Sequence, residues 1–183
     1  MARLFWAEIV KTFLKKRTYL GFLIVLVIIP IVELAFKAEG GRFLRMATRN
    51  LANDFFILGN LFNGWFVAYQ VMNALWIHVP LLITFVAGDM LAGEATAGTY
   101  RLILIKPVSR TKILLAKYLT TVLYVVLFVA FLGVVSVGLA TALLGTGDLV
   151  VIQRGILVLP AEDVAWRFIV AYILAVAPKL TIA

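Results

Sequence analysis

The chain contains no cysteine, and its only histidine is His78. The absence of cysteine excludes disulfides, thiolate metal sites and thiol catalysis. A single histidine cannot supply a pair of imidazoles to hold a metal ion. We therefore expect no metal or cofactor to be bound by this chain itself.

Charged residues are also scarce, at 14% of the chain against about 25% in soluble proteins. Apolar residues make up 64%, and the mean hydropathy is +1.07. A single core of 183 residues has too little interior to bury that much apolar surface. Abundant Val, Leu, Ile and Phe exclude disorder. The remaining solvent for these side chains is lipid.

The charges that are present are mostly positive. Seventeen Lys and Arg against nine Asp and Glu give a net charge of +8. In a soluble protein this imbalance would favour nucleic acid. Here the cations lie between long apolar runs, where they set topology and contact anionic headgroups. We expect the lipid bilayer to be a partner, and no nucleic acid.

Long apolar runs predict the fold, since a spanning helix needs about 20 mostly apolar residues. We predict an all-α polytopic membrane protein with a single transmembrane domain over residues 1–183. Its predicted parts are an interfacial helix (1–17), four spans (19–36, 65–88, 110–144 and 164–183), external loops (37–64 and 145–163) and a cytoplasmic loop (89–109). The fourth span is expected to be incomplete, because the sequence stops within an apolar run.

The first 17 residues are amphipathic at the helical period. Their predicted apolar face comprises Leu4, Phe5, Ile9, Phe13 and Leu14. Cations from Lys11 to Arg17 lie on the polar side and at the C-terminal end, where they suit the helix dipole. The segment is predicted to lie in the headgroup plane. The alternative is a cationic flank that only sets orientation.

The distribution of Lys and Arg predicts the orientation. Residues 1–17 and 89–117 carry five each, ten in all, whereas the loops predicted on the opposite side carry six. The positive-inside rule therefore places the N-terminus in the cytoplasm.

Two further patterns predict local structure. Leu149–Ile152 and Ile156–Leu159 flank Gln153-Arg154-Gly155, which predicts a small external hairpin. An apolar interfacial loop is the alternative. In the third span, Ala130, Gly133, Ser136 and Ala140 form a stripe of small residues, which is expected to permit close helix packing.

The most specific segment joins the second and third predicted spans. Gly98 suits the C-cap of the preceding predicted helix. Thr99 suits the N-cap of a short apolar helix, and Pro107 ends that short helix. That helix holds four consecutive aliphatic residues, 102–105, within the most polar connection of the chain. Such residues are expected to lie against headgroups or in a groove on another protein.

Two acids precede this short helix. Asp89 and Glu94 fall in the last turns of a predicted helix, where the dipole disfavours negative charge by about 0.3–1 kcal/mol. We expect Arg101, Arg110 and Lys112 to offset that cost. A solvated charge cluster at the membrane boundary is the alternative.

These residues together carry a family resemblance. Asp89, Glu94, Gly98-Thr99, the aliphatic run, Pro107-Val108-Ser109-Arg110 and Lys117 resemble ABC-2 type transporter permeases. The similarity is strongest over residues 86–118, within the subfamily for multicopper-enzyme maturation, gliding motility and sodium or drug export. Such permeases usually have six spans, so this chain resembles the first two-thirds of one, truncated after the fourth.

The resemblance implies a coupling helix at about residues 99–105, which docks on a separate nucleotide-binding ATPase subunit. That partner would use ATP and Mg, and a second permease copy or paralogue would complete the pathway in a prokaryotic cytoplasmic membrane. The implied coupling residues are Asp89, Glu94, Gly98, Thr99, Arg101, Leu102, Ile103, Ile105, Pro107, Ser109, Arg110 and Lys117. Independently, the chain has no G-x-x-x-x-G-K-[ST] phosphate loop of its own.

Two other function classes were weighed against this one. A secondary transporter or channel subunit would use Gln70, Asn73 and His78 as pathway residues. Spacing puts Gln70 and His78 on one face, although interhelical hydrogen bonds explain the same residues. An enzyme is disfavoured, because no Ser/His/Asp set or carboxylate pair falls at one membrane depth.

The predicted topology can be tested by cysteine labelling, because the natural chain has no cysteine to interfere. An impermeant thiol reagent should reach a cysteine at position 50 from outside and one at position 106 only from the cytoplasm. The reverse pattern would show that the orientation is wrong.

Overall fold

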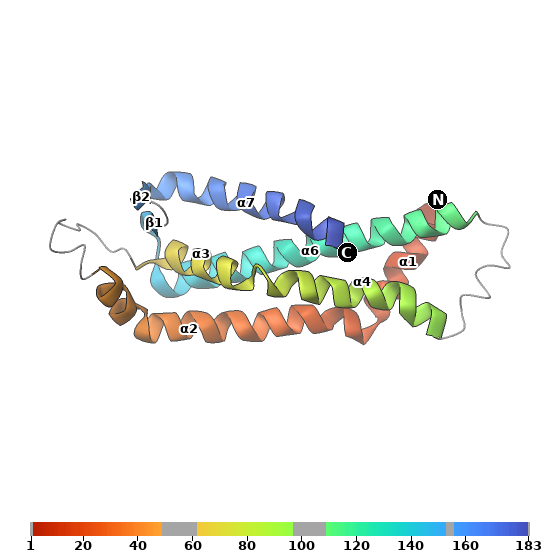
Figure 1. Ribbon diagram of the computed structural model, residues 1–183, viewed down its shortest axis with the longest axis horizontal. Coiled ribbons are helices and arrows are strands. Elements are labelled where there is room, and N and C mark those ends of the chain that lie inside the picture. Colours follow the sequence, from red (N-terminus) through yellow and green to blue (C-terminus); the bar gives the residue numbers. More distant parts are fainter. Residues whose placement is uncertain (1, 49–61, 97–108, 153–155, 183) are drawn as a thin grey trace. The chain divides into compact units, whose positions relative to one another are not determined.

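The computed structural model describes residues 2–48, 62–96, 109–152 and 156–182, and within these ranges it is helical apart from one hairpin (Figure 1). The helices are α1 (Ala2–Leu14), the 3-10 helix η1 (Lys16–Tyr19), α2 (Leu20–Thr48), α3 (Gly64–Leu75), α4 (His78–Thr96), α6 (Arg110–Leu144) and α7 (Ala161–Ile182). The strands are β1 (Leu149–Ile152) and β2 (Ile156–Leu159).

Two of these helical stretches, Lys16–Arg42 and Arg110–Leu144, are long and apolar enough to cross a membrane. Helices α3 and α4 add a third span if they are counted as one broken span. Helix α7, with Glu162, Asp163 and Arg167 in its first two turns, is not among them. The described residues therefore show a helical, membrane-associated protein with two or three of the four predicted spans.

The boundaries of α6 are those predicted for the third span, but the first span was predicted too short. Helix α2 continues from the predicted end at Phe36 to Thr48, into the predicted loop 37–64. Its polar turns remain helical, and Glu39 pairs there with Arg42 at 3.4 Å in an i,i+3 arrangement. A drop in hydropathy therefore marks where the apolar stretch ends, and not where the helix ends.

The second predicted span is wrong as a single continuous helix. It is interrupted at Trp76 and Ile77, between α3 and α4. Pro80 supplies the reason, since proline has no N–H to donate to the Trp76 carbonyl and its ring clashes with that carbonyl. The Trp76 N–H instead bonds the Asn73 carbonyl, which closes α3 with a tighter turn.

The chain divides into two compact units. Unit 1 comprises Met1–Ile24, Ile77–Phe131 and Leu174–Ala183, and unit 2 comprises Val25–Trp76 and Leu132–Ile173. In unit 1, the Phe22 ring meets Tyr124, Phe128 and Phe131 edge-on at centroid distances of 5.7, 5.2 and 5.1 Å. These edge-to-face contacts fix the start of α2 against α6.

The predicted hairpin is confirmed in unit 2. Strands β1 and β2 pair antiparallel, from Leu149 opposite Leu159 to Ile152 opposite Ile156, and connect α6 to α7 (Figure 1). The hairpin is bonded to two helix starts. Asn63 caps α3 through the Phe66 N–H and donates to the Asp148 carbonyl at 2.7 Å, and the Asp148 carboxylate accepts the N–H of Ala161.

The small-residue stripe of α6 packs as predicted at three of its four positions. Ala140 is fully buried beside Gly64, whose N–H donates to the Gly145 carbonyl at 2.9 Å. Gly133 faces the ring of Tyr172, and Ser136 is fully buried. Ala130 is the exception, because it is exposed.

Gly64 tests this packing. A Cβ at this position would lie 2.6 Å from the Ala140 carbonyl oxygen and from the Thr141 Cα, both of which are backbone atoms. Gly64→Ala should therefore lower the free energy of unfolding by about 1–3 kcal/mol, measured by thermal unfolding in detergent. The matched control is Gly138→Ala, because a Cβ there meets nothing within 4 Å and should stabilise the helix slightly. Equal effects of the two variants would contradict the packing.

Candidate functional site

Helix α1 turns its polar residues toward the protein. Thr12 is buried and Glu8 and Lys15 are partly buried, at spacings that place them along one side. Trp6, Val10 and Leu14, each four residues apart, are exposed, with Leu14 at 77%. A helix is confirmed within residues 1–17, and of the predicted apolar face Leu14 is exposed while Leu4, Phe5, Ile9 and Phe13 are partly buried. The outward stripe of large apolar side chains suits lipid or headgroups.

The turn that joins α1 to α2 is held by hydrogen bonds that involve two threonines. The Thr18 hydroxyl donates to the Thr12 carbonyl at 2.6 Å, and both threonines are buried. The Tyr124 hydroxyl on α6 donates in turn to the Thr18 carbonyl at 3.3 Å. These bonds satisfy carbonyls that the end of α1 leaves without helical partners, and they position Lys15 and Arg17.

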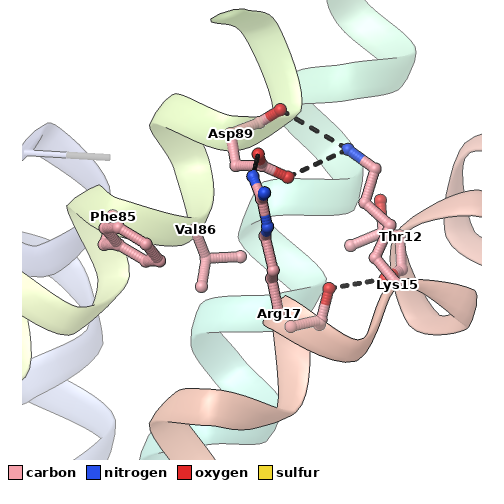
Figure 2. A pocket seen from close by; sticks show the side chains of 7 residues that line it. Thr12, Lys15, Arg17, Phe85, Val86 and Asp89 are labelled. Carbon is pink, nitrogen blue, oxygen red and sulfur yellow. Dashed lines mark hydrogen bonds and ion pairs between the residues drawn. The ribbon is translucent and has the colours of Figure 1, made fainter. Parts of the chain in front are cut away.

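Lys15 and Arg17 converge on Asp89 of α4 (Figure 2). The Lys15 Nζ lies 3.0 Å from the Asp89 Oδ2, and the Arg17 Nη1 lies 3.1 Å from the Oδ1. Lys15 also donates to the Asp89 carbonyl at 3.4 Å. Asp89 follows the apolar stretch that ends at Gly88. The Lys15 hydrogen bond lowers the pKa of its carboxyl below the ordinary value, against a smaller opposing effect of burial.

A second ion pair joins α1 to α6. The Lys117 Nζ donates to the Glu8 Oε2 at 3.0 Å, and the side chains are only 4% and 13% exposed. A pair held this far from water is screened little by salt, and removing one partner leaves a buried charge uncompensated.

We call Glu8, Lys15, Arg17, Asp89 and Lys117 the ion-pair junction. Asp89 belongs to α4, which precedes residues 97–108, and Lys117 belongs to α6, which follows them. Helix α1 and the turn that follows it are therefore ion-paired with the helices on both sides of that segment, α1 with α6 and the turn with α4.

The pocket at the junction is too small for a substrate. It is lined by Thr12, Lys15, Arg17, Thr18, Phe85, Val86 and Asp89 (Figure 2), and its volume is about 10 Å³. That space holds one water at most. Within the described ranges, no group of three or more His, Cys, Asp or Glu could hold a metal ion.

Of the predicted coupling residues, the structure brings Asp89 and Lys117 into the junction. Glu94 lies in the last turn of α4, Ser109 directly precedes α6, and Arg110 is the exposed first residue of α6. The remaining predicted coupling residues lie outside the described residues: Gly98, Thr99, Arg101, Leu102, Ile103, Ile105 and Pro107. Arg101, Arg110 and Lys112 were the cations expected to offset the charges of Asp89 and Glu94. The cations that pair with Asp89 are instead Lys15 and Arg17, and Arg101 lies outside the described residues.

The predicted pathway residues do not form one face. Gln70 and Asn73 belong to α3 and His78 begins α4, so the helical spacing between Gln70 and His78 no longer applies. Asn73 is exposed, and its amide donates to the Tyr69 carbonyl of its own helix at 3.0 Å. This local bond accounts for Asn73 without a translocation role.

Sequence reasoning missed Glu8, Thr12 and Thr18 altogether. The available signal was the helical spacing of Glu8, Thr12 and Lys15, which puts these three polar residues along one side of the N-terminal segment. On a helix that lies in lipid, such a line of polar residues marks the protein-facing side.

The comparisons with known proteins identify a family. A family model described as protein of unknown function (DUF2705) matches residues 23–176. The chain belongs to this family. The match covers most of the chain, including Asp89 and Lys117 of the junction. Comparisons of this DUF2705 member with curated proteins and with solved structures gave no significant match.

The buried pair of the junction predicts a large mutational effect in this DUF2705 chain. Lys117→Met leaves the Glu8 carboxylate unpaired and should destabilise by up to about 3–5 kcal/mol. The double variant Glu8→Gln with Lys117→Met should be less destabilised than the sum of the two single variants. The control is Arg42→Met, which removes an exposed ion pair and should cost about 0–1 kcal/mol. Thermal unfolding measures all four variants, and strict additivity would contradict the coupling.

Proposed function

We propose that this chain is the membrane-spanning permease subunit of an ABC-2 type transporter, and that it exports a substrate. A separate nucleotide-binding subunit would hydrolyse ATP and drive the permease through residues 99–105. The proposal rests on the resemblance at residues 86–118. It is supported by one structural observation, the ion pairs between the N-terminal segment 8–17 and both helices that flank residues 97–108.

A coupling segment needs a rigid connection to the helices that it moves. Asp89 lies seven residues before Thr96, the last residue of α4, and Lys117 lies seven residues after Arg110, the first residue of α6. Both are paired with the N-terminal segment 8–17, so a displacement of the intervening segment would be passed to α4, α6 and segment 8–17 together. A loop without such a connection would absorb the displacement locally.

The partners follow from the same proposal. The ATPase subunit supplies the nucleotide site, and a second permease copy or a paralogue completes the pathway. The exposed stripe of Trp6, Val10 and Leu14 would lie in the cytoplasmic leaflet of a prokaryotic cytoplasmic membrane, with Lys11 and Lys16 near anionic headgroups. The N-terminus would therefore be cytoplasmic.

Leu102→Asp tests the proposal. If Leu102 inserts into a groove on the ATPase subunit, the substitution buries an unpaired charge there. That should weaken association by about a hundredfold or more. Co-purification of the ATPase subunit and substrate-stimulated ATP hydrolysis should both collapse, while membrane insertion persists.

The matched control is Val158→Asp, the same chemical change at an exposed aliphatic residue of the hairpin. This variant should retain the ATPase subunit. Full association of the Leu102→Asp protein at normal expression would refute the proposed function. So would equal loss of the partner from both variants, because the effect would then not be specific to residues 99–105.

A further inference from the structure

A group of polar side chains in unit 2 is buried without partners. Both carboxylate oxygens of Glu33 on α2, the Ser136 hydroxyl on α6 and the Tyr172 hydroxyl on α7 are shielded from solvent. None has a hydrogen-bond partner among the described residues. Glu33 and Ser136 are both 0% exposed.

The three side chains are mutually close. The Tyr172 ring packs over Gly133, three residues before Ser136, and its hydroxyl lies near the Ser136 hydroxyl without a well-formed hydrogen bond and within longer electrostatic range of the Glu33 carboxylate. Carboxylate and hydroxyl oxygens from three helices therefore converge on one place. Within the described ranges, the one other buried polar atom without a partner is the Trp65 Nε1, also in unit 2, which can donate but cannot bind a cation.

An unpaired carboxylate at this position is costly. Transfer of an isolated ionised carboxylate into an apolar interior is strongly unfavourable, so a counter-charge or a proton is needed. Folded proteins leave few buried polar groups unsatisfied, and an unrecorded ion is one of the accepted reasons. Lys37, one turn further along α2, is exposed and forms no ion pair with Glu33 among the described contacts.

We propose that Glu33, Ser136 and Tyr172 form an intramembrane binding site for one monovalent cation, either H⁺ or Na⁺. One carboxylate balances one positive charge. All the atoms that could bind an ion here are oxygens, which are good ligands of hard cations and poor ligands of soft metals. A divalent ion would leave an excess positive charge in the low-dielectric interior. The proposal does not rest on the proposed function.

The two hydroxyl groups would interact differently with Na⁺ and with H⁺. With Na⁺, the carboxylate and both hydroxyls bind the ion through lone pairs. With H⁺, Glu33 becomes a neutral acid whose O–H can donate to Ser136 or Tyr172. Either occupant satisfies oxygens that the protein itself leaves without partners.

The test uses the full chain reconstituted in phosphatidylcholine nanodiscs. Thermal unfolding is followed against NaCl, with choline chloride keeping ionic strength constant, at alkaline and at mildly acidic pH. The variants are Glu33→Gln and, as the matched control, Glu39→Gln, which changes an exposed acid of the same helix. Infrared spectra report whether a protonated carboxyl group is present.

If Na⁺ is the ligand, the unfolding temperature at alkaline pH should rise by about 3–6 °C at tenfold saturation. Glu39→Gln should respond in the same way, and Glu33→Gln should not respond. If H⁺ is the ligand, sodium should have no effect. The wild type and Glu39→Gln should then show a protonated-carboxyl band that Glu33→Gln lacks.

Two hydroxyl variants provide a second test in case the Glu33→Gln protein misfolds. Ser136→Ala and Tyr172→Phe keep the carboxylate and should weaken the apparent cation affinity by about tenfold or more, in Na⁺ concentration or in pH. The proposal is overturned if the wild type shows neither a sodium response nor the infrared band. It is equally overturned if Glu33→Gln folds and behaves as the wild type does, or if both hydroxyl variants leave the response unchanged.

Discussion

The structure of unit 1 depends on charged side chains held between helices and away from water. Glu8 and Lys117 attract each other in a medium of low dielectric constant, where neither can exchange its partner for solvent at low cost. This requirement sets the rotation of α1, because Glu8, Thr12 and Lys15 must face the protein. Trp6, Val10 and Leu14 then necessarily face outward. Lipid makes this arrangement favourable, since outward apolar side chains are solvated there and inward charges are paired.

The two units differ in whether their inward-facing polar side chains have partners among the described residues. In unit 1, the charges of Asp89 and Lys117 are neutralised by partners from the N-terminal segment 8–17. In unit 2, the oxygens of Glu33, Ser136 and Tyr172 are brought together without such partners. A satisfied network rigidifies its surroundings, whereas an unsatisfied one raises the free energy of the folded state. The first arrangement suits a mechanical connection, and the second suits occupancy by an ion.

Hydropathy and helical period predicted the helical membrane class, the bounds of α6 and the N-terminal helix. The β-prone runs about Gly155 predicted the hairpin, because short aliphatic runs separated by a glycine-containing sequence are local signals. The interruption before Pro80 was missed, since a run of apolar residues looks the same whether or not its backbone is continuous. Asp89 and Lys117 were singled out, but their partners lie 72 to 109 residues away in sequence. No spacing rule reaches that far, so local pattern could not pair them with Arg17, Lys15 or Glu8.

The hydrogen bonds of Asn63 and Asp148 have a consequence for the kinetics of unit 2. Asn63 caps α3 and holds the Asp148 carbonyl, while the Asp148 carboxylate holds the first N–H of α7. The Gly64 N–H meets the Gly145 carbonyl just beyond α6. These four hydrogen bonds connect the starts of α3 and α7 to residues 145–148, which directly follow the end of α6. Separation of the start of α3 from the segment after α6 must break two of these bonds at once, so the amide hydrogens at this end of the unit should exchange slowly.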